Sequence, residues 1–229
     1  MKIDKRVNYR IVIDVETAPM DITLNSVTPQ NMLVYDVGYA VIDKKGNVYK
    51  TESVLVKEIF IDEYTLMQSA YYKNKIPSYW EDVLMHKRQI KSLYEIRKAL
   101  IEDIETFNVK EIYAHNMRFD YGALNNTIRW LTKSKYRYFF PKQLKICDTL
   151  KMSRSVIGNM ATYKKFCEKN GYLTKRGQLR FTAEILTRYI KKDNAFVESH
   201  TGLEDVLIEK DILAYCYRQH KAMRKLLWE

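Results

Sequence analysis

Linkers, repeats and low-complexity tracts are absent from this sequence. Its 229 residues hold only seven glycines and four prolines, no Pro/Gly/Ser-rich stretch divides them, and the composition does not shift along the chain. A chain of this length fits one large domain or two small ones. Because nothing marks a boundary, we expect a single domain over residues 1–229.

Long apolar runs and cysteine pairs are missing as well. No segment approaches the roughly 20 apolar residues of a membrane-spanning helix, and the N-terminus lacks the pattern of a signal peptide. We therefore expect no membrane partner and a cytoplasmic location, which is the host cytoplasm if a phage encodes the chain. Cys147, Cys167 and Cys216 are widely spaced without a CxxC pair. They are interpreted as reduced packing residues rather than disulfide partners or zinc ligands.

Negative charge is scarce relative to positive charge. The 28 Asp and Glu against 39 Lys and Arg leave a formal net charge of +11. A field of this sign attracts a polyanion, so nucleic acid is the favoured partner. Excess lysine can also serve solubility alone. The charge therefore supports a nucleic-acid partner without establishing it.

What the chain does contain is a sizeable apolar fraction in an α/β pattern. Hydrophobic residues make up 46% of it, and β-branched or alternating runs predict strands at 9–15, 34–42 and 48–60, joined as an antiparallel meander by the turn DKKGN. Three- and four-residue spacing predicts amphipathic helices at 92–107 and 120–131. Short strands are expected at 111–114 and 144–147, and helices dominate from 159 onward. This is a mixed α/β domain.

Two acids end the first strand. Side chains alternate across a strand, so Asp14 and Glu16 project from the same face of an otherwise apolar run. Like charges so placed repel each other and raise each other's pKa unless a cation compensates. Alternatively, the strand simply ends here and both acids reach water. The pair by itself indicates a metal site only weakly.

A third acid, Asp120, lies four residues before Leu124 and hence on the inward stripe of its helix. The alternative is an acid favoured at a helix N-terminus by the helix dipole. The preceding residues favour a site: Asn116 can orient neighbouring groups by hydrogen bonds, and Phe119 offers an apolar anchor or a face for a base.

Asp205 repeats this arrangement at the start of the last long helix, three and seven residues before Ile208 and Ile212. The acids at 204 and 209 are expected to point outward. His200 lies five residues earlier, before Gly202, in a predicted loop from which it can reach over a metal site. For the remaining histidines, at 86, 115 and 220, an ordinary surface position is expected.

Together these residues form three motifs that resemble the DEDDh family of 3′-to-5′ exonucleases, the DnaQ-like group with a ribonuclease H-like fold. The motifs are DVET (14–17), NMRFD (116–120) and HTGLED (200–205), and CDT (147–149) is similar to a strand ending that lies between the second and third. The resemblance spans about residues 9–220. It implies a mixed central sheet, with an antiparallel meander plus parallel strands, flanked by α-helices.

The resemblance also implies a set of roles. Asp14, Glu16, Asp120 and Asp205 would hold two divalent cations, Mg²⁺ or Mn²⁺, and His200 would be the general base toward the attacking water. Oxygen ligands suit both metals. Carried over from the motif positions, Thr17 and Asn116 are expected to contact the substrate or the ligands, and Phe119 the substrate.

The implied activity is hydrolysis at the 3′ ends of single-stranded or frayed DNA, releasing nucleoside 5′-monophosphates. Because the motifs do not distinguish DNA from RNA, an RNA-directed enzyme similar to oligoribonuclease or ribonuclease T is an alternative. A nuclease-like module that binds nucleic acid without turnover is another. Relatives of ribonuclease T are often dimers, and the oligomeric state stays open.

Three further segments allow two interpretations each. The polar stretch 18–33 is either a substrate-gripping loop or a disordered connection. The cationic and aromatic stretch 133–145 is suited to backbone contacts and base stacking on single strands, or is an edge of the core with solvated lysines. The basic stretch 171–182 is a turn or hairpin candidate with the same ambiguity.

Overall fold

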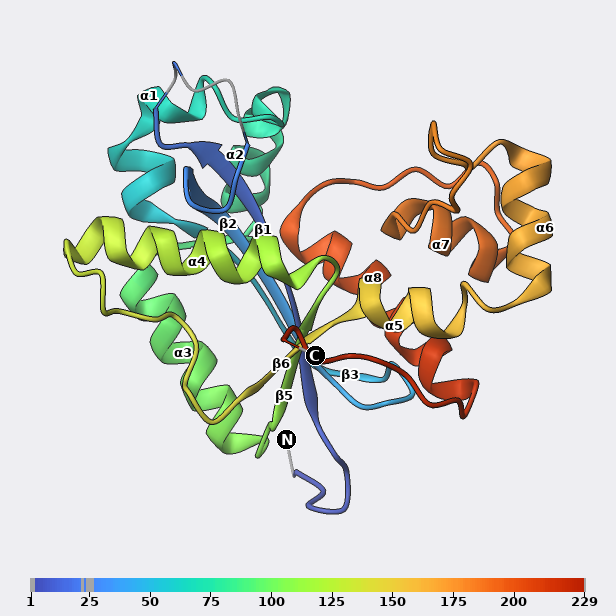
Figure 1. The fold of residues 1–229 in the computed structure, drawn as a ribbon. Helices are drawn as coiled ribbons and strands as arrows, with labels where there is room; N and C mark the ends of the chain where they lie inside the picture. The colour runs from blue at the N-terminus through green and yellow to red at the C-terminus, as the bar shows by residue number, and fades with distance from the viewer. Residues whose placement is uncertain (1–2, 22, 24–26, 229) are drawn as a thin grey trace.

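A six-stranded mixed sheet forms the centre of the computed structural model, which describes residues 3–21, 23 and 27–228 (Figure 1). The strand order is β4-β3-β2-β1-β5-β6. The strands are β1 (Arg10–Pro19), β2 (Met32–Ile42), β3 (Val48–Val56), β4 (Gln89–Lys91), β5 (Glu111–Ala114) and β6 (Lys145–Asp148).

The sheet combines both kinds of pairing. Strands β1, β2 and β3 pair antiparallel, while β5 is parallel to β1, β6 to β5, and β4 to β3. The predicted mixed sheet of a meander plus parallel strands is therefore confirmed. β3 ends at Val56 rather than at residue 60, because the chain turns there into a short π-helix, η1 (Glu58–Asp62).

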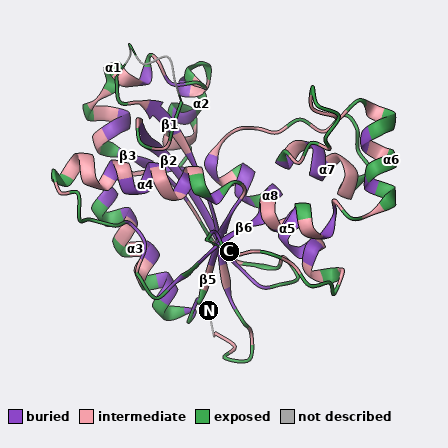
Figure 2. Cartoon of the chain, in the orientation of Figure 1, coloured by how far each residue is buried: buried purple, intermediate pink, exposed green. Residues whose placement is uncertain are grey.

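Helices cover both faces of the sheet, as Figure 1 shows. The helices α3 and α4 lie on one side and α5 to α8 on the other; the strands between them are largely buried (Figure 2). Their bounds are α3 (Leu93–Thr106), α4 (Met117–Thr132), α5 (Thr149–Val156), α6 (Ala161–Asn170), α7 (Ala183–Lys191) and α8 (Gly202–Arg218).

Alternation along β1 divides the core in two. Ile11 and Ile13 belong to the apolar cluster that includes Leu100 of α3 and Leu124 of α4, whereas Val12 packs in the cluster of α5 to α8. Side chains two and four residues after Val12 therefore face α8. Among the described residues, no helix has the length and apolar character needed to cross a membrane.

The sequence patterns predict no helix between β3 and β4. This region nevertheless folds into η1, α1 (Tyr64–Met67), η2 (Lys73–Lys75) and α2 (Ile76–Leu84). We refer to residues 58–84 as the 58–84 segment. These helices are too short to give a regular apolar period. Tertiary packing fixes them instead, through buried side chains such as Phe60 and Tyr79.

One close approach sets the position of α8. Gly202, its first residue, lies against Gly38 of β2, where a Cβ atom on Gly38 would overlap the carbonyl group of Gly202. Gly202 donates its N–H to Asp36 of β2 at 3.0 Å, and Arg88 donates to the other oxygen of Asp36 at 2.5 Å. Because neither glycine has a side chain, helix α8 can begin directly against the sheet.

We expect Gly38→Ala to destabilise the protein by about 2 kcal/mol, because the new methyl group meets backbone atoms that cannot rotate away. Chemical denaturation measures the change in free energy of unfolding. The control is Gly171→Ala, where nothing lies within 4 Å of the added methyl group. There the only penalty is the positive φ of 72°, which disfavours alanine by about 1 kcal/mol. A loss for Gly38→Ala no larger than for the control would contradict the close packing.

Candidate functional site

Two half-buried carboxylates lie near the end of β1. Asp14 and Glu16 are separated by the buried Val15, and they share the face of β1 that Val12 presents to α8. This is the placement expected from alternation. Both lie toward the carboxyl end of the parallel strands β1 and β5, where open α/β sheets place their ligand sites. Thr17, the next motif residue, is buried at 7% exposure.

Helix α4 brings Asp120 to the same region. The helix begins at Met117, three residues earlier than expected, because Asn116 takes a left-handed conformation that ends β5 sharply. Asp120 is therefore in the first turn, with 3% of its surface exposed. The backbone N–H groups of Asp120 itself and of Val15 on β1 act on its carboxylate and partly oppose the rise in its pKa. The side chain of Asn116 is exposed and that of Phe119 half-buried.

The start of α8 supplies Asp205 and, before it, His200. Asp205 is 5% exposed, and one of its oxygens accepts the backbone N–H of His200 at 3.2 Å. Ser199 donates to the same oxygen at 3.4 Å. His200 is in a loop, as expected, with a left-handed φ of 54°. These hydrogen bonds to Asp205 join the first turn of α8 to the loop that carries His200.

Possible ligand atoms converge in two groups that share Asp205. Asp14, Glu16 and Asp205 each offer one oxygen, and these lie within 4.8 Å of one another. Glu198, His200 and Asp205 form a second such group with the same limit. Segments nearly 200 residues apart in sequence therefore meet in one small volume, and carboxylate oxygens in this number suit Mg²⁺ or Mn²⁺.

The acids of the site have strongly perturbed protonation. Burial, followed by repulsion from Asp36, raises the pKa of Glu16 to about 9. Burial raises the pKa of Asp120 to about 8 and that of Asp205 to about 7, the latter with help from Glu198. Burial and the neighbouring acids also raise the pKa of Asp14 well above its usual range. A bound cation would remove this cost, so the donor set fits divalent metal ions.

Glu209 corrects one sequence expectation. It does not point outward from α8; only 3% of it is exposed, and it accepts the backbone N–H of His115 at 3.0 Å. Burial and repulsion from Asp120 raise the pKa of Glu209 well above its usual range. Of the acids near Asp14, Glu209 in turn contributes most to raising the pKa of Asp14. Its position four residues after Asp205 places it on the same helical stripe. That spacing could have identified it.

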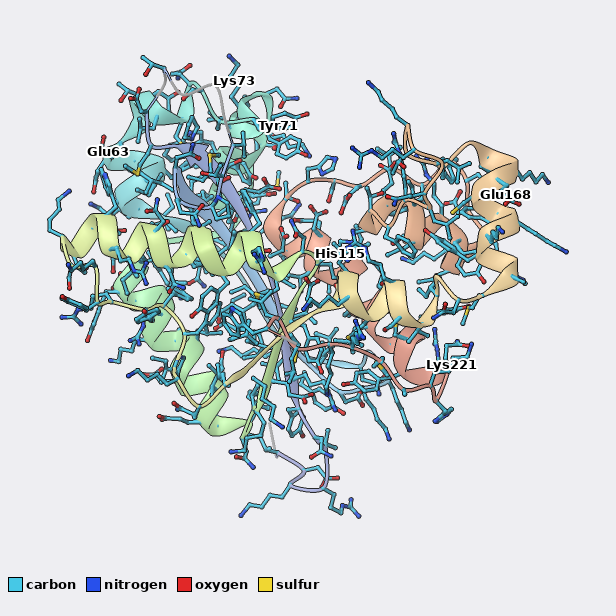
Figure 3. The ribbon with its side chains drawn as sticks, viewed as in Figure 1. Glu63, Tyr71, Lys73, His115, Glu168 and Lys221 are labelled. Carbon is cyan, nitrogen blue, oxygen red and sulfur yellow. The ribbon has the colours of Figure 1, made fainter. Side chains whose placement is uncertain are left out.

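His115 is a second correction, because it is not an ordinary surface imidazole. Its Nδ1 lies 3.0 Å from the hydroxyl of Thr149, and its Nε2 lies 2.7 Å from the carbonyl oxygen of Phe181. Figure 3 labels it at the junction from β5 to α4. Asp148, at the end of β6, accepts the N–H of the adjacent Asn116 at 3.1 Å and caps α5. The turn before Asp120 is therefore held from several elements.

Glu198 was not singled out by the sequence either. It lies two residues before His200, with Oε2 at 4.0 Å from Nδ1 of His200. Burial and repulsion from Glu184 raise its pKa to about 7. No apolar period marks residue 198, since it belongs to the loop before α8, and only the folded chain brings it to the site.

The basic and aromatic stretch 133–145 is divided by the fold. Phe139 and Phe140 are buried, as expected for an edge of the core. Tyr136 and Tyr138 are exposed. The guanidinium of Arg129 lies 4.7 Å from the ring centre of Tyr138. This stretch follows the last turn of α4, about 20 Å along the helix from Asp120.

The other two segments lie nearer the site. The stretch 171–182 is a hairpin, as one interpretation had it, with a bridge between Leu173 and Leu179, and its Phe181 contacts His115. Of the stretch 18–33, residues 22 and 24–26 lie outside the described part. Its described end packs on α4, where Pro29 is directly beside Gly122.

Comparison with solved structures places this architecture among nucleases. Exonuclease I from Methylocaldum szegediense matches 93% of this chain with a TM-score of 0.56 and 15% identity, and the zinc-bound E. coli exonuclease I complex with single-stranded DNA matches 94% with 0.52 and 14%. Cell-death related nuclease 4 matches 96% with 0.51 and 10%. The chain spans 41%, 42% and 67% of these proteins, respectively.

Sequence comparison adds no relative to these. No protein-family model matches the chain, and no curated protein is significantly similar to it in sequence. The structural likeness at such low identity concerns the fold. The fold predicted for this chain, a ribonuclease H-like mixed sheet flanked by helices, is confirmed by it.

The perturbed acids predict how the stability of the metal-free protein depends on pH. Their pKa values in the folded state, about 7 to about 9 for Asp205, Asp120 and Glu16, exceed those of the unfolded chain, which lie near 4. The folded state therefore binds more protons, and stability falls as the pH rises from about 4 to about 9. We expect a lower melting temperature in EDTA at pH 9 than at pH 6. Excess Mg²⁺ or Mn²⁺ should reduce this difference, and a difference unchanged by the cations would contradict a metal site here.

Glu209→Gln separates charge from hydrogen bonding, because glutamine can still accept the N–H of His115. At pH 8 and in EDTA we expect a higher melting temperature than for the unchanged protein, since a repelled carboxylate is removed. Calorimetric titration should show Mn²⁺ binding weakened by about 10-fold. The control is Glu102→Gln, an acid 62% exposed on α3. Equal behaviour of the two variants would mean that Glu209 contributes no charge to the site.

Proposed function

We propose that this protein is a metal-dependent 3′-to-5′ exonuclease of the DEDDh type that hydrolyses single-stranded or frayed DNA to nucleoside 5′-monophosphates. The observation that carries the proposal is the position of Asp205. Its carboxylate belongs both to the acidic group with Asp14 and Glu16 and to the group with His200. A charge-binding centre and a proton acceptor therefore lie side by side, as hydrolysis of a phosphodiester requires.

Each side chain has a role in this proposal. Asp14, Glu16, Asp120 and Asp205 would hold two divalent cations. When bound, such cations lower the pKa of water and stabilise charge on the attacking and leaving oxygens. His200 accepts the proton of the attacking water, which its position beside Asp205 allows. Thr17, Asn116 and Phe119 contact the substrate or the ligands.

The fold and the charge support a nucleic-acid substrate. Exonuclease I, whose fold resembles this one, has been solved with single-stranded DNA, and the chain carries a net charge of +11, which favours binding of a polyanion. Lys73 and Lys75 in the 58–84 segment, and the hairpin 171–182, supply cations on two elements that contact the site region.

We expect full-length protein with Mg²⁺ or Mn²⁺ to shorten 5′-labelled single-stranded DNA stepwise from its 3′ end, with EDTA abolishing the reaction. Asp14→Asn should reduce hydrolysis to background, and His200→Ala should reduce kcat by about 10²-fold to 10⁴-fold. Asp4→Asn, which changes an acid that is 42% exposed and paired with Arg6 near the N-terminus, is the matched control and should retain full activity.

The same time course on RNA of matched sequence decides the sugar preference. Faster cleavage of RNA would replace the DNA enzyme by an exoribonuclease. Absence of hydrolysis on DNA, RNA and dinucleotides with either cation, together with retained binding of single strands, would identify a non-catalytic module. Activity that survives Asp14→Asn would overturn the proposed site itself.

A further inference from the structure

The 58–84 segment contacts the site through Tyr72 and Lys75. The ring of Tyr72 is stacked on the imidazole of His200, with centroids 4.6 Å apart and planes inclined by 11°. The ammonium group of Lys75 lies 3.5 Å from the carbonyl oxygen of His200 and 5.6 Å from the ring centre of Tyr72. Figure 3 labels the neighbouring Tyr71 and Lys73 on this segment.

His200 needs such contacts to keep one orientation. Its φ of 54° lies in the left-handed region, which is unfavourable for a non-glycine residue. Such a conformation persists only when surrounding groups determine it. The backbone N–H of His200 is bound to Asp205 and its carbonyl oxygen lies at Lys75. These two contacts fix the backbone, but they leave the imidazole free to rotate about χ1 and χ2.

The tyrosine ring restrains that rotation. A nearly parallel ring covers one face of the imidazole, and the edge of His200 is left toward Glu198 and Asp205, with which it shares ligand atoms within 4.8 Å. A group that accepts a proton must be held within hydrogen-bond reach of the water that it activates. A loop histidine with 36% of its side chain exposed would otherwise sample outward rotamers.

We propose that Tyr72 and Lys75 are positioning residues that hold His200 over the metal-binding acids, so that the 58–84 segment completes the active site. The inference rests on the proposed function for its kinetic consequence. Its structural content, the restraint of His200, stands on the contacts of Tyr72 and Lys75. Tyr72 acts through its ring, because the stack on His200 does not require a hydrogen bond of its hydroxyl group.

The kinetic test compares Tyr72→Phe, Tyr72→Leu and the control Tyr94→Leu, which changes a tyrosine 74% exposed on α3. Tyr72→Phe preserves the stack and should retain kcat. Tyr72→Leu should lower kcat by about 10-fold with KM unchanged, since substrate binding is not affected. In a His200→Ala background, Tyr72→Leu should have no further effect, because the group that it positions is gone.

Lys75 is tested in the same way. Lys75→Met keeps the length of the side chain but removes the ammonium group beside the carbonyl oxygen of His200, and it should lower kcat by a few-fold. Lys73→Met, on the exposed neighbour, is the comparison for substrate attraction: it should raise KM and leave kcat unchanged. If both lysine variants raise KM equally and leave kcat unchanged, then Lys75 contributes only to the general attraction of the substrate.

A second readout does not depend on activity. In the NMR spectrum, the imidazole protons of His200 should be shifted upfield by the stacked ring of Tyr72, in Tyr72→Phe as in the unchanged protein, and should move downfield in Tyr72→Leu. If the protein proves inactive, this shift still tests the restraint. An active protein in which Tyr72→Leu keeps kcat and leaves the His200 signals in place would overturn the inference. So would a variant that changes only KM, since Tyr72 would then contact substrate.

Discussion

The contact between the first turn of α8 and strand β2 is the constraint on which the site depends. Gly202 lies against Gly38 and donates to Asp36, whose charge is balanced by Arg88. Without Arg88, the buried carboxylate of Asp36 would destabilise the fold by several kcal/mol. The ion pair and the absence of side chains at Gly38 and Gly202 therefore both hold α8 against β2. Only because α8 begins there do Asp205 and His200 reach the acids of β1.

The site itself is costly for the fold. Several carboxylates lie with little exposure near one another, and their raised pKa values show that the folded chain holds them against their preference for water. The chain compensates with backbone N–H groups directed at Asp120, Asp205 and Glu209. Cations would contribute the remainder. Apolar side chains buried in the two cores, one on each side of the sheet, supply the stability that offsets the cost of the buried carboxylates.

The region around His200 is built from elements that have no motif of their own. The 58–84 segment supplies Tyr72 and Lys75, the loop before α8 supplies Glu198, and the hairpin 171–182 contacts His115. These elements surround residues whose motif positions are recognisable in sequence. A site of this kind therefore has side chains at its centre that the motifs identify, and supporting side chains around them that only the fold identifies.

The sequence by itself predicted the strands β1, β2, β3, β5 and β6 and the amphipathic helices α3 and α4, because period-2 and period-3.6 patterns are local properties. It singled out the candidate acids by motif spacing, and it missed the short elements β4, α1 and α2. Asp14, Glu16 and Asp205 could be placed on inward faces from alternation and helical stripes alone. The tertiary structure decided the inward position of Glu209, the hydrogen bonds of the His115 ring to Thr149 and Phe181, and the stack of Tyr72 on His200. These depend on which elements pack together across the sheet, a choice made by burial and close packing that no local pattern encodes.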